Sequence, residues 1–151
     1  MLGFLAPANC VSALEGLVKF SQANKIVFLE VAVTDEEKSK GLMNRTLLAE
    51  NRGMVFVFRP ERTVTFWMKD TLISLDMIFV RYGKIVHIVK NAIPNQTQIL
   101  YPSEFPVTEV IEVNGGFSDA NMIEIGSQVE FENISHIEYS MSSKLMIIPR
   151  Q

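Results

Sequence analysis

The sequence has 151 residues, of which 48% are hydrophobic and 21% charged, a composition typical of a single globular domain with a continuous core. The formal net charge of −3 argues against a protein that binds nucleic acid by neutralising phosphates. One cysteine and two histidines exclude an internal disulfide and a cysteine-built zinc site, so neither a metal nor a cofactor is predicted.

Residues 1–24 are predicted to be an N-terminal arm. Residues 1–13 are apolar and end in small residues, but they lack a basic region and are interrupted by a proline and an asparagine. We therefore favour an uncleaved arm over a cleavable signal peptide. The apolar run is too short to span a bilayer, and no transmembrane segment is predicted. Ser12 and Glu15 have the spacing of a capping box, which predicts a helix in this arm.

Residues 25–139 are predicted to form the main domain, followed by a C-terminal tail at residues 140–151. Short β-rich segments separated by turn residues predict strands at 25–33, 53–58, 63–69, 75–80, 84–89, 107–113, 129–131, 134–139 and 145–148. This pattern indicates a mainly β fold, a small antiparallel β-sandwich or jelly-roll-like barrel with one or two short helices. Alternation along the strands predicts a core that contains Phe56, Phe58, Phe66, Met68, Met77, Phe79, Ile111 and Val113.

A short helix is predicted at about residues 35–42. Thr34 and Glu37 have the spacing of a capping box, and Gly41 follows at the position where a helix commonly ends. Residues 91–106, which contain three prolines, are predicted to form a long loop.

A polar cluster is predicted around the segment Phe66–Asp76. A short turn at residues 70–74 would place Lys69 opposite Asp76 across a hairpin, with Trp67 beside them. The simpler interpretation is an ordinary cross-strand ion pair next to a core tryptophan. The alternative is a group of polar residues at the mouth of a ligand-binding pocket, with the candidate residues Arg45, Trp67, Lys69, Asp70, Asp76 and Glu112.

Several motifs together resemble one known family. In chain order they are GLMNR at 41–45, GMVFVF at 53–58, FWMKDT at 66–71, LD at 75–76 and VIEV at 110–113, followed by two glycines. The chain resembles domain-of-unknown-function family 192 over about residues 26–131. This resemblance implies a small, mainly β domain of sandwich or jelly-roll type, and it leaves the biochemical activity open. Family members are commonly exported or membrane-tethered.

The sequence departs from the family pattern at positions that bear on a shared ligand. Asp70 stands where the family typically has asparagine, and Ser74 where it has proline. A carboxylate in place of an amide adds a negative charge beside Lys69. Many relatives also carry cysteines in the region that matches residues 91–102, where this chain has none.

Three hypotheses about function follow. The first is a non-catalytic interaction module, for example a subunit or decoration component of a larger assembly. It would bind protein partners or self-associate through the apolar terminal extensions. The second is a small-ligand-binding extracytoplasmic protein with a pocket at Trp67, Lys69 and Asp76. The third is a hydrolytic enzyme with Asp70 and Asp76 as acid and base. We favour the first and predict no catalytic residue, because no nucleophile–base pair or phosphate loop is present. An uncleaved chain fits the cytoplasm or an assembly such as a virion, and the resemblance also permits export.

Overall fold

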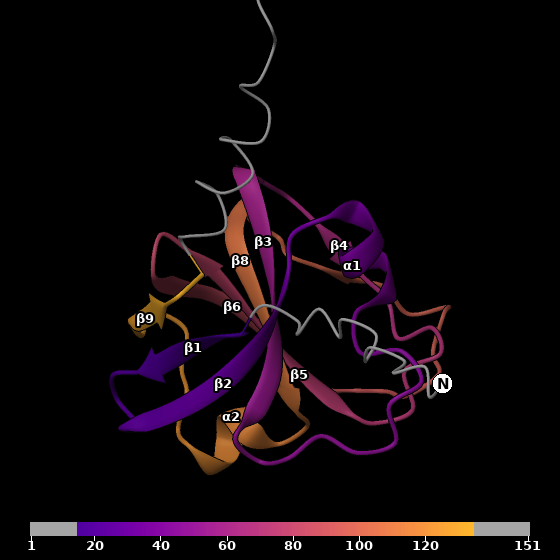
Figure 1. The fold of residues 1–151 in the computed structure, drawn as a ribbon, viewed down its shortest axis with the longest axis horizontal. Coiled ribbons are helices and arrows are strands. Elements are labelled where there is room, and N and C mark those ends of the chain that lie inside the picture. Colours follow the sequence, from indigo (N-terminus) through magenta and orange to yellow (C-terminus); the bar gives the residue numbers. More distant parts are fainter. Residues whose placement is uncertain (1–14, 135–151) are drawn as a thin grey trace, which may run out of the picture.

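One curled seven-stranded sheet carries most of the fold, in a computed structural model that describes residues 15–134 (Figure 1). In spatial order the strands are β6 (Lys84–Ala92), β5 (Leu75–Arg81), β8 (Val107–Asn114), β3 (Arg52–Arg62), β2 (Lys25–Ala32), β1 (Glu15–Phe20) and β9 (Val129–Glu132). The sheet forms a half-barrel, and a bridge between Lys84 and Gln128 brings its two end strands together at one rim. The predicted mainly β fold is confirmed.

Neighbouring strands are antiparallel with one exception, the parallel pair of β2 and β3. Parallel strands need a crossover connection. Here the crossover contains the helix α1 (Asp35–Lys40). A second, two-stranded sheet pairs β4 (Thr65–Phe66) with β7 (Tyr101–Pro102), and the helix α2 (Phe117–Ala120) follows β8. Figure 1 shows α1 beside β4 at one side of the half-barrel.

The helix predicted near Ser12–Val18 is wrong, because residues 15–20 form the strand β1. Its even-numbered residues are buried, among them Val18 and Phe20. β1 pairs with β2 on one side and with β9 on the other. These non-local pairings outweigh a local capping signal whose first residue lies outside the described residues.

The helix predicted after Thr34 is confirmed. The Glu37 amide donates to Thr34 Oγ1 at 3.2 Å, and the Thr34 amide donates to Glu37 Oε2 at 2.9 Å, which completes the capping box. Gly41 ends the helix with φ of +46°, in the region that favours glycine. A Cβ atom there would lie 3.2 Å from the Phe56 ring, so α1 approaches β3 closely at this point.

Both faces of the sheet carry a hydrophobic cluster. One contains Phe20, Leu29, Ile78, Ile111 and Val113. The other lies on the side of α1 and β4 and contains Phe56, Phe58, Met68, Met77 and Phe79. Every predicted core residue is buried except Phe66, which is partly buried at the edge of the second cluster. Within residues 15–134, none of the helices is long and apolar enough to cross a membrane.

Candidate functional site

A groove of about 450 Å³ opens between α1 and β4. Phe56 and Phe58 enter it from β3, Phe66 from β4 and Trp67 from the residue that follows. The Phe56 and Phe66 rings meet edge to face, with centroids 5.0 Å apart. Trp67 is the one tryptophan of the sequence and is 47% exposed. Because Phe56 and Phe58 are buried, the aromatic surface that the groove offers to a small molecule comes chiefly from Trp67 and the partly buried Phe66.

A smaller space of about 30 Å³, which we call the closed end, adjoins the groove and is lined by Glu112. The two spaces share Lys38, Ser39, Phe56, Phe66 and Trp67. A space of this size accepts a single small polar group or a water molecule. Thr71 also lines it, with its hydroxyl donating to the Lys69 carbonyl oxygen at 3.1 Å.

Glu112 is the unusual group at this closed end. It lies on β8 between Met54 of β3 and Met77 of β5, and only 5% of it is exposed. Its carboxyl group has no hydrogen bond within the part of the chain that the structure describes. Burial raises the pKa of this carboxyl to about 8, because a charged carboxylate would lose its hydration there. At neutral pH the group is therefore mostly protonated and can donate a hydrogen bond.

Positive charge gathers at the mouth of the groove. Lys38 Nζ lies 4.8 Å from the centroid of the Phe58 ring, and the Arg62 guanidinium lies 5.3 Å from the same centroid. Burial, and then the nearby Arg62, lower the pKa of Lys38. Lys40 lines the closed end, and Asp35 is the acidic residue of the outer groove. The mouth therefore has more cationic than acidic side chains.

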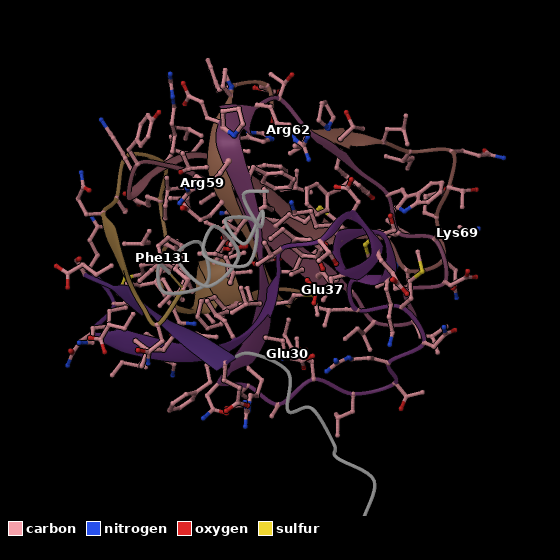
Figure 2. The ribbon with its side chains drawn as sticks, turned by 45° about the horizontal axis from the view of Figure 1, so that its top comes forward. Glu30, Glu37, Arg59, Arg62, Lys69 and Phe131 are labelled. Carbon is pink, nitrogen blue, oxygen red and sulfur yellow. The ribbon has the colours of Figure 1, made fainter. Side chains whose placement is uncertain are left out.

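Two of the six predicted site residues, Trp67 and Glu112, line the same space. Lys69 is beside them but outside: its Nζ lies 5.5 Å from the centroid of the Trp67 ring, and the side chain is exposed. Figure 2 shows Lys69 at the outer edge of the molecule, on the side of α1.

The predicted ion pair between Lys69 and Asp76 is wrong. β4 pairs with β7 rather than with β5, so the expected hairpin does not form. Asp76 is fully buried in β5, and its carboxylate accepts hydrogen bonds from three backbone amides: those of Asn91 at 2.8 Å, Gly116 at 3.0 Å and Ser118 at 2.8 Å. Asp76 therefore holds a turn and the start of α2, and it does not face the groove.

Arg45 and Asp70 are likewise engaged elsewhere. The Arg45 guanidinium makes two hydrogen bonds of 2.5 Å to the Glu30 carboxylate. Asp70 is exposed, with φ of +52°, and its carbonyl oxygen accepts from the Asn44 amide at 2.7 Å. Neither residue lines the groove or its closed end.

Sequence reasoning did not single out Lys38, Arg62 or Thr71 as site residues, and it assigned the groove phenylalanines only to the core. The capping box located α1, but nothing local in the sequence places that helix over β3 and β4. The parallel crossover from β2 to β3 creates this arrangement. Residues that a crossover connection brings together in space are not separated by a fixed number of positions in the sequence, so no sequence motif identifies them.

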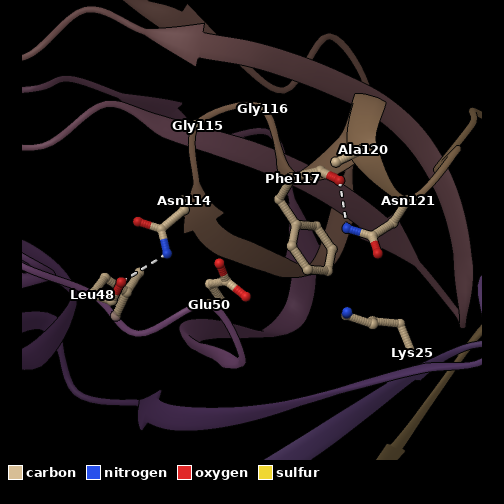
Figure 3. Close-up of a pocket in the computed structure, with 9 residues that line it drawn as sticks. All are labelled: Lys25, Leu48, Glu50, Asn114, Gly115, Gly116, Phe117, Ala120 and Asn121. Carbon is tan, nitrogen blue, oxygen red and sulfur yellow. Dashed lines mark hydrogen bonds between the residues drawn. The ribbon is translucent and has the colours of Figure 1, made fainter.

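A second pocket, of about 560 Å³, lies below the turn formed by Gly115 and Gly116 (Figure 3). Its amide side chains are already used: Asn114 Nδ2 donates to the Leu48 carbonyl oxygen and Asn121 Nδ2 to that of Phe117, both at 2.9 Å. Lys25 and Glu50 point into its open part (Figure 3). Because its polar groups already have partners or face solvent, this pocket is the weaker candidate.

Within residues 15–134, no group of three or more His, Cys, Asp or Glu side chains is placed to hold a metal ion. The apolar terminal extensions of the sequence lie largely outside these residues, at 1–14 and 135–151.

Solved structures resemble the chain, among them two bacterial proteins. A protein of unknown function from Novosphingobium aromaticivorans DSM 12444 is 37% identical with a TM-score of 0.73, over 83% of this chain and 93% of that one. A protein from Sinorhizobium meliloti 1021, provisionally described as a transcription regulator, is 32% identical with a TM-score of 0.72, over 78% of this chain and 92% of that one. No curated protein matches the chain. The model of domain-of-unknown-function family 192, described as "Uncharacterized ACR", matches residues 17–131, and the chain belongs to this family.

Proposed function

We propose that this protein binds a small organic molecule in the groove between α1 and β4. The observation that carries the proposal is the Glu112 carboxyl group, which is buried, has no hydrogen bond within the described residues and lines the closed end of an aromatic groove. The Glu112 oxygens are not among the fully enclosed polar side-chain atoms of the described residues, so the carboxyl group remains accessible from the closed end. A ligand that reaches it could supply the hydrogen-bond partner that the described residues do not.

The surrounding residues support a binding role. Four aromatic side chains and a few polar groups at one end of a concave space are typical of small-molecule sites. A catalytic role has no comparable support, since the carboxylate pair considered from the sequence consists of an exposed Asp70 and a buried Asp76 bonded to backbone amides.

DNA binding, which the provisional description of the Sinorhizobium meliloti protein raises, has less support in this chain. The formal net charge is −3, whereas DNA-binding domains carry an excess of Lys and Arg on one face. We therefore retain small-molecule binding as the proposed function.

The test uses the full chain and its one tryptophan. Because Trp67 lies in the groove wall, its fluorescence reports on occupancy of the groove without labelling. A panel of small metabolites is screened by Trp67 fluorescence and by thermal denaturation. A true ligand at a hundredfold excess over its Kd should stabilise the protein by about 2.7 kcal/mol.

Two variants on α1 provide the matched control. Ser39→Phe places a ring at the mouth of the groove, whereas Glu36→Phe adds the same ring to an exposed position that does not line it. Ligands of the groove should lose binding in the first variant and keep it in the second. If no compound binds the native protein, or if Ser39→Phe binds as well as the native chain, the proposal is wrong.

A further inference from the structure

We infer that the ligand of this groove is a small carboxylic acid with a flat apolar body, whose carboxylate enters the closed end between Glu112 and Lys38. This inference rests on the proposed function and specifies the chemical class of the ligand. It follows from the size of the closed end, from the charges around it and from the hydrogen-bonding state of Glu112.

The volumes of the closed end and the outer groove determine which part of the ligand can reach Glu112. The closed end has a volume of about 30 Å³, whereas the outer groove has about 450 Å³. A ring therefore fits only the outer part, where Phe66 and Trp67 supply its main aromatic contacts. The group that reaches Glu112 must be small and polar.

The charged side chains around the closed end favour an anionic ligand group next to Glu112. The titratable side chains that line the closed end with Glu112 are Lys38 and Lys40, both from α1. The groups that face it from β3 and β4 are phenylalanine rings, and the neighbouring segments supply Leu42, Met43, Trp67 and Thr71. An ammonium ligand would meet two like charges here, whereas a carboxylate would meet two opposite ones. Burial and, after it, the nearby Arg62 lower the pKa of Lys38, and an anion beside Lys38 would favour its charged form.

Glu112 completes the match when it is protonated. With its pKa raised to about 8, it carries a proton at neutral pH and can donate it in a hydrogen bond to a ligand carboxylate. A short hydrogen bond between a carboxylic acid and a carboxylate is among the stronger ones in proteins. Once the pH exceeds the pKa, the ionised Glu112 would repel the same ligand.

The test compares three small aromatic probes that differ in their polar group: benzoate, benzamide and benzylamine. Their affinities for the full chain are measured by titration calorimetry at pH 6.5 and pH 9. At pH 6.5 we expect benzoate to bind at least about tenfold more tightly than benzylamine, and its affinity to fall by about tenfold at pH 9 as Glu112 ionises. Benzamide should bind with little pH dependence.

Two variants separate the two charged partners. Glu112→Gln keeps the shape and the hydrogen-bond donor but cannot ionise, so benzoate binding should lose most of its pH dependence. Lys38→Met keeps the apolar stem and should weaken benzoate but not benzamide. Lys84→Met on β6, which does not line the groove, is the control and should change neither.

The outcomes distinguish this inference from the proposed function. If benzylamine or benzamide binds best, or if benzoate binds more tightly at pH 9, the groove binds ligands but the assignment to carboxylic acids is wrong. If Lys38→Met leaves benzoate unaffected, the same conclusion follows. If none of the three probes binds and the wider panel also yields no ligand, the proposed function itself fails.

Discussion

Asp76 and Glu112 are both buried carboxyl groups on neighbouring central strands, but their surroundings give them different roles. Asp76 accepts hydrogen bonds from three backbone amides, so its charge is compensated within the protein. Glu112 faces a small space without such partners. The first arrangement is a structural anchor, and the second is available to a ligand.

Removing the Asp76 carboxylate should destabilise the fold severely. Asp76→Ala would leave the amides of Asn91, Gly116 and Ser118 without their acceptor, and we expect a loss of about 3–5 kcal/mol in the free energy of unfolding. Asp70→Asn is the control, because asparagine tolerates the positive φ at this exposed position, and it should change stability by less than about 0.5 kcal/mol. Urea denaturation measures both. A loss below about 1 kcal/mol for Asp76→Ala would contradict the anchoring role.

Glu112 should make the stability of the protein depend on pH. Its folded pKa of about 8 lies above the ordinary value of 4.5, so the folded state holds a proton that the unfolded chain releases. The stabilisation is therefore fully present below about pH 4.5 and is lost as the pH rises toward 8, by at most about 1.4 kcal/mol per pH unit. The difference between the native chain and Glu112→Gln, measured by urea denaturation from pH 5 to 9, isolates this contribution. A constant difference over that range would show that Glu112 ionises normally.

At the scale of elements, the short helix α1 depends on its capping box. Only six residues long and without buried side chains, α1 gains little from packing, so its N-terminus should be sensitive to the cap. Thr34→Ala should cost about 1 kcal/mol of stability, whereas Thr34→Ser keeps the hydroxyl and should cost much less. Amide hydrogen exchange of Glu37 and Lys38 checks this directly. Equal exchange in both variants would mean that contacts other than the cap hold the helix.

Elements whose signals are local could be predicted from the sequence, and those that depend on distant partners could not. The Thr34–Glu37 box and the Gly41 stop lie within one turn of each other, and both are found in the structure. The alternation of β3 and β8 likewise identified buried residues such as Phe56 and Ile111. By contrast, the spacing of Ser12 and Glu15 predicts a helix where β1 forms. The pairing of β1 with β2 and β9 leaves no pattern within the segment itself that would indicate a strand.

The candidate site follows the same rule. Trp67 and Glu112 stood out by residue type, but they lie 45 positions apart in the chain and only the sheet brings them to one cavity. The expected partner of Lys69 was wrong because β4 pairs with β7 across the long proline-containing segment rather than with the next strand. Register and crossover geometry, rather than composition, therefore decide which polar residues converge.

At the scale of the whole molecule, the half-barrel combines an anchored side and an open side. α2 and the Gly115–Gly116 turn are tied to the sheet through Asp76. On the other side, the groove between α1 and β4 leads to Glu112. The groove lies over the second hydrophobic cluster, to which Phe56 and Phe58 of its lining also belong. Substitutions on α1, which has no buried side chains, should therefore disturb the core less than substitutions at these phenylalanines.

The apolar terminal extensions of the chain are predicted to make intermolecular contacts. The described residues 15–134 already form a seven-stranded sheet with a hydrophobic cluster on each face, and we predict that a chain shortened to these residues stays folded. If Leu145–Ile148 and the apolar N-terminal residues bind a partner or a second copy, the shortened chain should be monomeric where the full chain is larger, since burying such side chains contributes about 25 cal/mol per Å². Sedimentation analysis of both chains gives their masses, and circular dichroism confirms that the shortened chain is folded. If the shortened chain unfolds while the full chain is monomeric, the extensions belong to the core of the domain and the interaction hypothesis is wrong.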